Sequence, residues 1–186
     1  MNMIWVYLKI GFQHVIPLGY DHILFILSLF LFNSKLKTAI IQCSIFTLAH
    51  SLTLALVALG YLHFNTNIIE SVIALSIFFV ALENTTQPKL KWWRLGLVFA
   101  FGLVHGMGFA SALNEIGLPK NEFIPALIGF NFGVEVAQIT IILICYSFVA
   151  KWFSEKVWYQ AKLVNPLSMG ISGIALFWAI ERFLTN

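Results

Sequence analysis

Long apolar stretches separated by short polar segments run along almost the whole chain. Six of them are long enough to cross a bilayer, which takes roughly 20 helical residues each. We expect these helices at about 15–33, 38–60, 66–85, 94–113, 123–150 and 165–184. Residues 1–13 are too short to span, and Trp5, Tyr7 and Lys9 are typical of an interfacial segment. The pattern predicts an all-α polytopic membrane protein with about six transmembrane helices in a single domain, 1–186.

The composition supports this prediction. Of the 186 residues, 60% are hydrophobic and only 10% are charged, whereas an average soluble domain is about half apolar and a quarter charged. A chain of this length cannot bury so much apolar surface in one water-soluble core. The net charge of +3 is too small to indicate nucleic acid as a partner. Cys43 and Cys145 lie far apart inside apolar runs, so they predict neither a disulfide framework nor a CxxC metal site.

The positions of lysine and arginine predict the orientation. One set of loops contains Lys35, Lys37, Lys89, Lys91, Arg94, Lys151, Lys156 and Lys162, and the opposite set, with both termini, contains Lys9, Lys120 and Arg182. By the positive-inside rule, the more basic set faces the cytoplasm. We therefore expect both termini outside, most simply in a bacterial inner membrane.

Ionisable side chains within the apolar runs are the candidate functional residues, because such groups are costly in a membrane and mark functional sites. They are Asp21, His22, His50, Glu70, Glu83, His105, Glu135 and, at the outer edge, His14. A helix rises about 1.5 Å per residue. With the orientation above, four of the expected helices place such groups at one depth in the outer half of the bilayer. These groups are Asp21, His22, His50, His105 and Glu135.

Three imidazoles with one or two carboxylates suit a divalent metal ion such as Zn²⁺, Ni²⁺, Co²⁺ or Fe²⁺. The predicted metal-site residues are His22, His50, His105, Asp21, Glu135 and His14. We expect the rings of His22, His50 and His105 to lie close enough to share one ion. A hydrogen bond between helices remains the simpler explanation for any single intramembrane histidine.

Several runs of the sequence resemble the HupE/UreJ family of membrane proteins. They are GFQHVIPLGYDHILFILSL (11–29), FTLAHSLTL (46–54), ALEN (81–84), FGLVHGMGFA (101–110) and FNFGVE (130–135). The resemblance implies a nickel or cobalt permease linked to hydrogenase and urease metal supply, with His14, Asp21 and His22 matching the family's histidine–aspartate signature. In the better-known nickel-linked branch, proline directly follows the first histidine. Here Val15 and Ile16 precede Pro17, so the chain looks nearer a second branch.

Three functions follow from these observations. In the favoured one, a permease for a divalent transition metal, His22, His50, His105 and Asp21 bind the ion, and Glu135 completes the site or exchanges protons. The second is an intramembrane zinc-dependent hydrolase of a lipid or peptide, with Glu135 and Asp21 as catalytic groups. The third is a structural or assembly protein. Lipid and a divalent metal ion are the expected partners, whereas the metal, the transport direction and the oligomeric state do not follow from the sequence.

Overall fold

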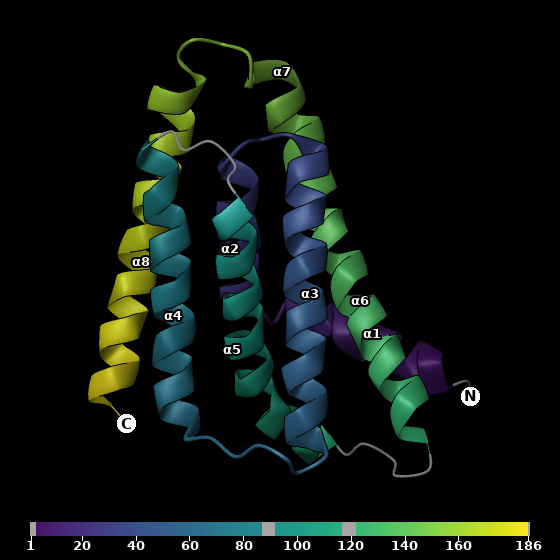
Figure 1. Cartoon of the computed structure of the whole chain (residues 1–186). Coiled ribbons are helices and arrows are strands. Elements are labelled where there is room, and N and C mark those ends of the chain that lie inside the picture. The colour runs from purple at the N-terminus through teal and green to yellow at the C-terminus, as the bar shows by residue number, and fades with distance from the viewer. Residues whose placement is uncertain (1–2, 87–91, 117–121, 186) are drawn as a thin grey trace.

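The structure is a computed structural model that describes residues 3–86, 92–116 and 122–185, and these residues form helices and no strand (Figure 1). The main helices are α1 (Met3–Val15), α2 (Tyr20–Leu31), α3 (Leu36–Ala58), α4 (Thr66–Glu83), α5 (Trp92–Ile116), α6 (Phe123–Cys145) and α8 (Asn165–Leu184). Short elements join or extend them: the 3₁₀ turn Asn84–Thr86, the π-helical segments Tyr146–Ala150 and Gln160–Val164, and α7 (Lys151–Phe153).

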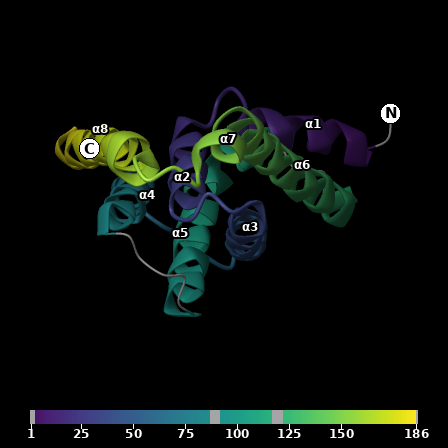
Figure 2. The same cartoon turned by 90° about the horizontal axis from the view of Figure 1, so that it is seen from above.

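The first expected span, 15–33, is not one continuous helix: it contains the last residue of α1, a break at residues 16–19, and α2. The axes of α1 and α2 are bent by 73° at the four residues between them. Pro17 in this break has no N–H group for a helical hydrogen bond. Gly19 lies so close to α1 that a Cβ atom there would be 2.3 Å from the carbonyl oxygen of His14. Residues 3–15 therefore form a helix that packs along α6, where sequence analysis predicted only an interfacial segment (Figure 2).

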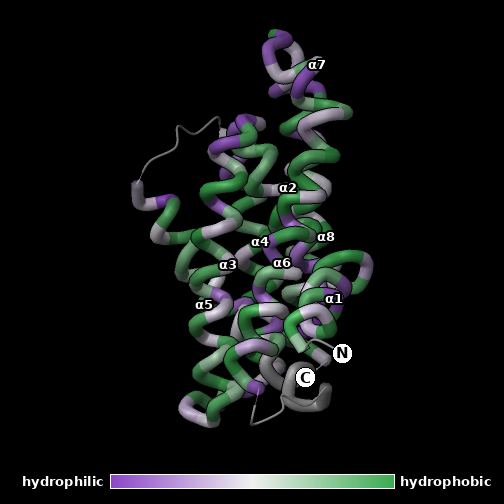
Figure 3. Tube along the Cα trace, turned by 90° about the vertical axis from the view of Figure 1, so that its right-hand side faces the viewer, coloured by the Kyte–Doolittle hydropathy of each residue, from purple (hydrophilic) through white to green (hydrophobic). Residues whose placement is uncertain are grey.

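Within the described residues, four helical segments are long and apolar enough to cross a membrane: Leu36–Ala58, Ile68–Thr86, Phe123–Phe153 and Gln160–Leu184. The bent pair α1 and α2 makes a fifth if it counts as one span. The expected number of six is not confirmed. Hydrophobic residues cover most of the length of the helices (Figure 3). Large apolar side chains such as Leu48, Phe132 and Phe177 are exposed, as expected for contact with lipid. The chain is an integral membrane protein.

Two helix pairs bring their backbones into contact through glycine. At the α1–α6 crossing, a Cβ atom on Gly11 or Gly133 would lie 2.0 or 2.1 Å from a backbone oxygen of the partner helix. At the α3–α5 crossing, the corresponding distances for Gly102 and Gly106 are 2.6 and 2.3 Å. Glycine is the residue that permits such close approach in membranes. These crossings fix the positions of the histidine-bearing segments relative to their neighbours.

Candidate metal centre

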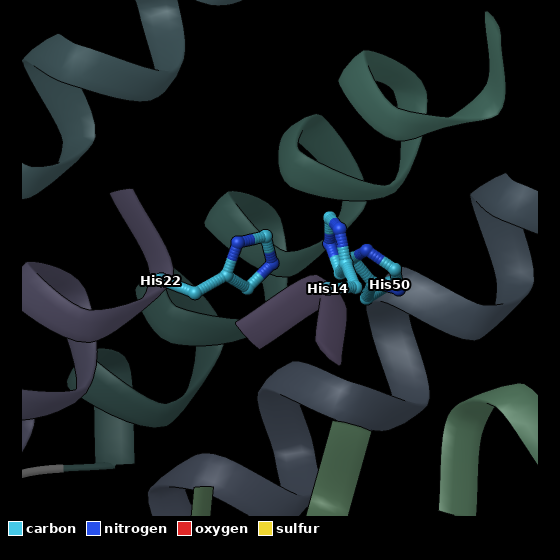
Figure 4. Close-up of side chains that lie close together, drawn as sticks. All are labelled: His14, His22 and His50. Carbon is cyan, nitrogen blue, oxygen red and sulfur yellow. The ribbon is translucent and has the colours of Figure 1, made fainter. Parts of the chain in front are cut away.

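Three histidines from three helices meet in the interior. His14 lies in the last turn of α1, His22 in the first turn of α2, and His50 in the middle of α3. One ring nitrogen from each can be chosen so that all three lie within 4.8 Å of one another. The ring centroids are 4.6 Å apart for His14 and His22 and 5.7 Å apart for His22 and His50 (Figure 4). His22 and His50 are almost inaccessible, at 6% and 0% exposure.

The bend between α1 and α2 is what allows His14 to join this group. On a straight helix, two residues eight positions apart lie about 12 Å apart along the axis. The break at Pro17 and Gly19 bends the chain by 73°, and the ring centroids of His14 and His22 come within 4.6 Å of each other. The depth argument from the sequence assumed straight helices, and it consequently assigned His14 to the outer edge of the membrane.

His105 lies next to this group and makes a different contact. Its ring centroid is 5.3 Å from that of His22, and its side chain is 1% exposed. Its Nε2 atom is 3.0 Å from the Ser76 hydroxyl on α4. Sequence analysis joined His22, His50 and His105 in one site, whereas the three histidines whose nitrogens lie within 4.8 Å of one another include His14 and not His105. A serine in an apolar helix carries no sequence signal that it will bind an imidazole on the next helix.

Neither of the two predicted carboxylates belongs to this three-residue group, although Asp21 directly precedes His22 in the chain. Asp21 Oδ2 accepts a hydrogen bond from Arg182 at 3.0 Å, and Glu135 Oε1 accepts one from the Ser44 hydroxyl at 2.5 Å. The other oxygen of each carboxylate is buried and has no hydrogen-bond partner among the described residues. Each carboxylate therefore retains one oxygen that could bind a cation.

Several imidazole nitrogens also have no hydrogen-bond partner in the described part of the chain: His14 Nε2, His22 Nε2, both nitrogens of His50, and His105 Nδ1. Nearly all buried polar atoms in proteins are hydrogen-bonded, so such a concentration requires a reason. A metal ion bound by one nitrogen each of His14, His22 and His50 would account for some of these atoms, because a neutral imidazole binds metal through the lone pair of one ring nitrogen. The donor set fits an ion of the zinc, nickel or cobalt type.

A cavity of about 830 Å³ opens beside the cluster. His14, His22 and His105 line it together with the charged residues Asp21, Glu70 and Arg182. Sequence analysis treated Arg182 as an ordinary outer charge. Its position one turn after Trp178, at the end of the last apolar helix, was the only feature of the sequence that could have indicated a role in the cavity. The cavity gives the histidines access to one end of the bundle.

Buried polar side chains continue from the cluster toward the opposite end of the bundle. One helical turn from His50, Thr47 donates to Gln138 at 3.1 Å. Further along α3, Gln42 accepts a hydrogen bond from Arg94 Nε at 2.9 Å. Arg94 also forms an ion pair with Glu83, and it is 1% exposed. A line of polar groups thus extends from the histidines to a buried ion pair.

Apolar spanning helices around a buried set of imidazoles define a polytopic membrane protein with a histidine cluster that could hold a metal ion. The HupE/UreJ family model, described as "HupE / UreJ protein", matches residues 1–182, and the chain belongs to this family. Neither the curated proteins nor the solved structures gave a match.

Proposed function

We propose that this protein is a permease for a divalent transition-metal ion, with nickel, cobalt and zinc as the candidate substrates. The observation that carries the proposal is the convergence of His14, His22 and His50, from three separate segments, within 4.8 Å inside a bundle of apolar helices. The association of the HupE/UreJ family with nickel and cobalt transport supports it.

In this proposal, the three imidazoles bind the ion, and the neighbouring carboxylates of Asp21 and Glu135 offset its charge. Nitrogen and carboxylate oxygen together form a donor set of intermediate hardness, which suits Ni²⁺, Co²⁺ and Zn²⁺ better than Cu⁺ or Ca²⁺. A metal ion competes with protons for such ligands, so binding weakens as the pH falls. Proton release on binding would couple transport to the proton gradient.

The surroundings of the cluster fit a transport path with two unequal halves. The 830 Å³ cavity provides access on one side. On the other side, the polar groups of Thr47, Gln138 and Gln42 lead to the ion pair of Arg94 with Glu83, which closes that end. A binding site between an open half and a closed half is the arrangement that alternating access requires. With the orientation inferred from the basic loops, the cavity faces outward, where it would receive the ion from outside.

A zinc-dependent intramembrane hydrolase is the second candidate, and the size of the cavity favours it. A volume of about 830 Å³ would hold a ligand far larger than one ion. Zinc held by three histidines with an open position beside a carboxylate can activate water. In that case, Asp21 or Glu135 would serve as the base.

Metal flux into proteoliposomes distinguishes these functions. Vesicles loaded with a metal-sensitive fluorophore should report uptake of Ni²⁺, Co²⁺ or Zn²⁺ by the wild-type protein, and His50→Ala should abolish it together with tight binding. His63→Ala is the matched control, because His63 lies on an exposed loop outside the cluster. A wild-type protein that binds the metal and never passes it would exclude the permease in favour of the hydrolase. Failure to bind any of the three ions would overturn both.

A further inference from the structure

Arg182 carries a permanent positive charge into the wall of the cavity beside the histidines. It lies in the last turn of α8, where its Nη2 donates to Asp21 Oδ2 at 3.0 Å and its Nη1 donates to the backbone carbonyl of Glu70 at 3.2 Å. The guanidinium also lies 5.4 Å from the ring of Trp178, another residue of the cavity wall. Arginine stays protonated at any physiological pH. A cation that enters this cavity therefore always encounters the positive charge of Arg182.

Asp21 uses only one of its two oxygens in this contact. Its Oδ1 is buried and accepts no hydrogen bond from the described residues, although the side chain as a whole is 28% exposed. The next residue is His22, whose Nε2 is likewise without a partner in that part of the chain. A carboxylate oxygen and an imidazole nitrogen are ligands for the same transition-metal ions. Asp21 is thus placed to exchange one cation for another.

We infer that Arg182 is the internal cation that holds Asp21 while no metal ion is bound, and that the ion displaces it from this carboxylate. The inference rests on the proposed function, since it concerns how the permease selects and releases its ion. A dication and a guanidinium repel each other strongly at short range in a low-dielectric environment, so both cannot hold Asp21 fully. Arg182 compensates the charge of Asp21 when the site is empty. It weakens the hold on the ion when the site is full, which allows release.

Glu70 offers the displaced guanidinium a second partner. Glu70 belongs to the wall of the same cavity, and its backbone carbonyl already accepts a hydrogen bond from Arg182. A reorientation from Asp21 toward Glu70 therefore preserves one existing contact. The exchange takes place where α4 packs against α8, the helices that carry Glu70 and Arg182.

This competition also makes Arg182 a specificity-determining residue. An ion displaces Arg182 from Asp21 only if its bonds to the imidazoles contribute more free energy than the lost ion pair did. Transition-metal ions bind imidazole nitrogen strongly, whereas Mg²⁺ and Ca²⁺ prefer oxygen ligands. Arg182 consequently excludes the more abundant hard cations from a cavity whose carboxylates would otherwise attract them.

The affinity of the purified full-length protein for Zn²⁺ tests the inference. We expect Arg182→Gln to bind Zn²⁺ more tightly by roughly 5–150-fold, the usual range of coupling between two sites. Mg²⁺ should inhibit Zn²⁺ binding more strongly in this variant than in the wild type. Lys9→Gln is the matched control, because it removes the same charge from an exposed position and should keep the wild-type affinity. An unchanged or weaker Zn²⁺ affinity in Arg182→Gln would overturn the inference.

Chemical modification of the wild-type protein provides a test that needs no folded variant. The chain contains two arginines, and Arg94 is 1% exposed. Mass spectrometry after treatment with phenylglyoxal therefore reports on Arg182. Zn²⁺ should speed this modification because it releases the guanidinium from Asp21, and an equal or slower rate with Zn²⁺ bound would exclude the exchange. A protein that binds none of Ni²⁺, Co²⁺ and Zn²⁺ refutes the proposed function as well, whereas normal binding without an effect at Arg182 refutes only this inference.

Discussion

Replacing Gly106 by alanine should disturb the proposed metal centre without changing any of its candidate ligands. A Cβ atom at this position would lie 2.2 Å from Thr53 Oγ1 and 2.3 Å from the backbone oxygen of His50. Ordinary contacts of a Cβ atom begin near 3.4 Å, so α5 and α3 would have to separate by about 1 Å. The segment that moves carries His50 itself. Backbone packing and ion binding are therefore tested by one substitution.

The expected magnitude follows from two opposing effects. Overpacking typically costs about 1–3 kcal/mol, and replacing glycine by alanine inside a helix recovers up to about 1 kcal/mol. We expect Gly106→Ala to lose up to about 2 kcal/mol of stability as the difference. Metal–ligand distances normally lie within about 0.2 Å of their preferred values, so a shift of about 1 Å in α3 is large for the site. The affinity for Ni²⁺ or Zn²⁺ should consequently fall about 10–100-fold, as it does when groups that orient ligands are lost.

The assay is competition with a chromophoric chelator, combined with thermal unfolding of the same samples in detergent. Gly96→Ala is the matched control on the same helix, because no atom lies within 4 Å of a Cβ atom built there. This control should keep its metal affinity and its stability. A stable Gly106→Ala protein that binds metal as tightly as Gly96→Ala would refute the reasoning, since it would mean that the α3–α5 contact does not position His50.

Three other predictions concern the charged groups and the orientation. Glu135→Gln should lower metal affinity, since one predicted negative ligand group is lost, whereas Glu122→Gln at the exposed start of α6 should keep the wild-type affinity in the same metal titrations. A cysteine at the exposed Lys35, in a background without native cysteines, should react with a membrane-impermeant maleimide only from the cytoplasmic side, and labelling from outside would reverse the orientation. Glu83→Gln should destabilise the protein by about 3 kcal/mol in denaturant titrations because it leaves the buried charge of Arg94 unpaired, and a stability equal to that of the wild type would show that the pair contributes nothing.

Much of the architecture could be predicted because lipid imposes a simple rule on sequence. Every backbone polar group in the hydrocarbon region must be bonded within its own helix, so spanning segments appear as long apolar runs. The membrane class and the family resemblance followed directly from the sequence. The break between α1 and α2 did not, even though Pro17 and Gly19 lie in it, because membrane helices often tolerate proline without a sharp turn. Local sequence indicates that a helix can break, and tertiary contacts decide the angle.

The same break explains why the membership of the histidine cluster was harder to predict than its existence. Ionisable residues in apolar runs identified His14, His22, His50 and His105 as candidates from their type alone. Which nitrogens converge depends on helix rotation and bending, which hydropathy does not encode. The partner of Asp21 was missed for a related reason, because Arg182 is 161 residues away and looks like an ordinary charge at the end of a helix.

Direct backbone contact makes the α1–α6 and α3–α5 pairs stiff, and each pair carries one of the three histidines, whereas His22 lies on α2. His14 belongs to the first pair and His50 to the second. The distance between the rings of His14 and His50 consequently depends on the angle between the two helix pairs. Bilayer thickness changes the tilt of membrane helices, so metal affinity should depend on the length of the surrounding lipid chains. The thickness of the membrane would then regulate the affinity of the site for its ion.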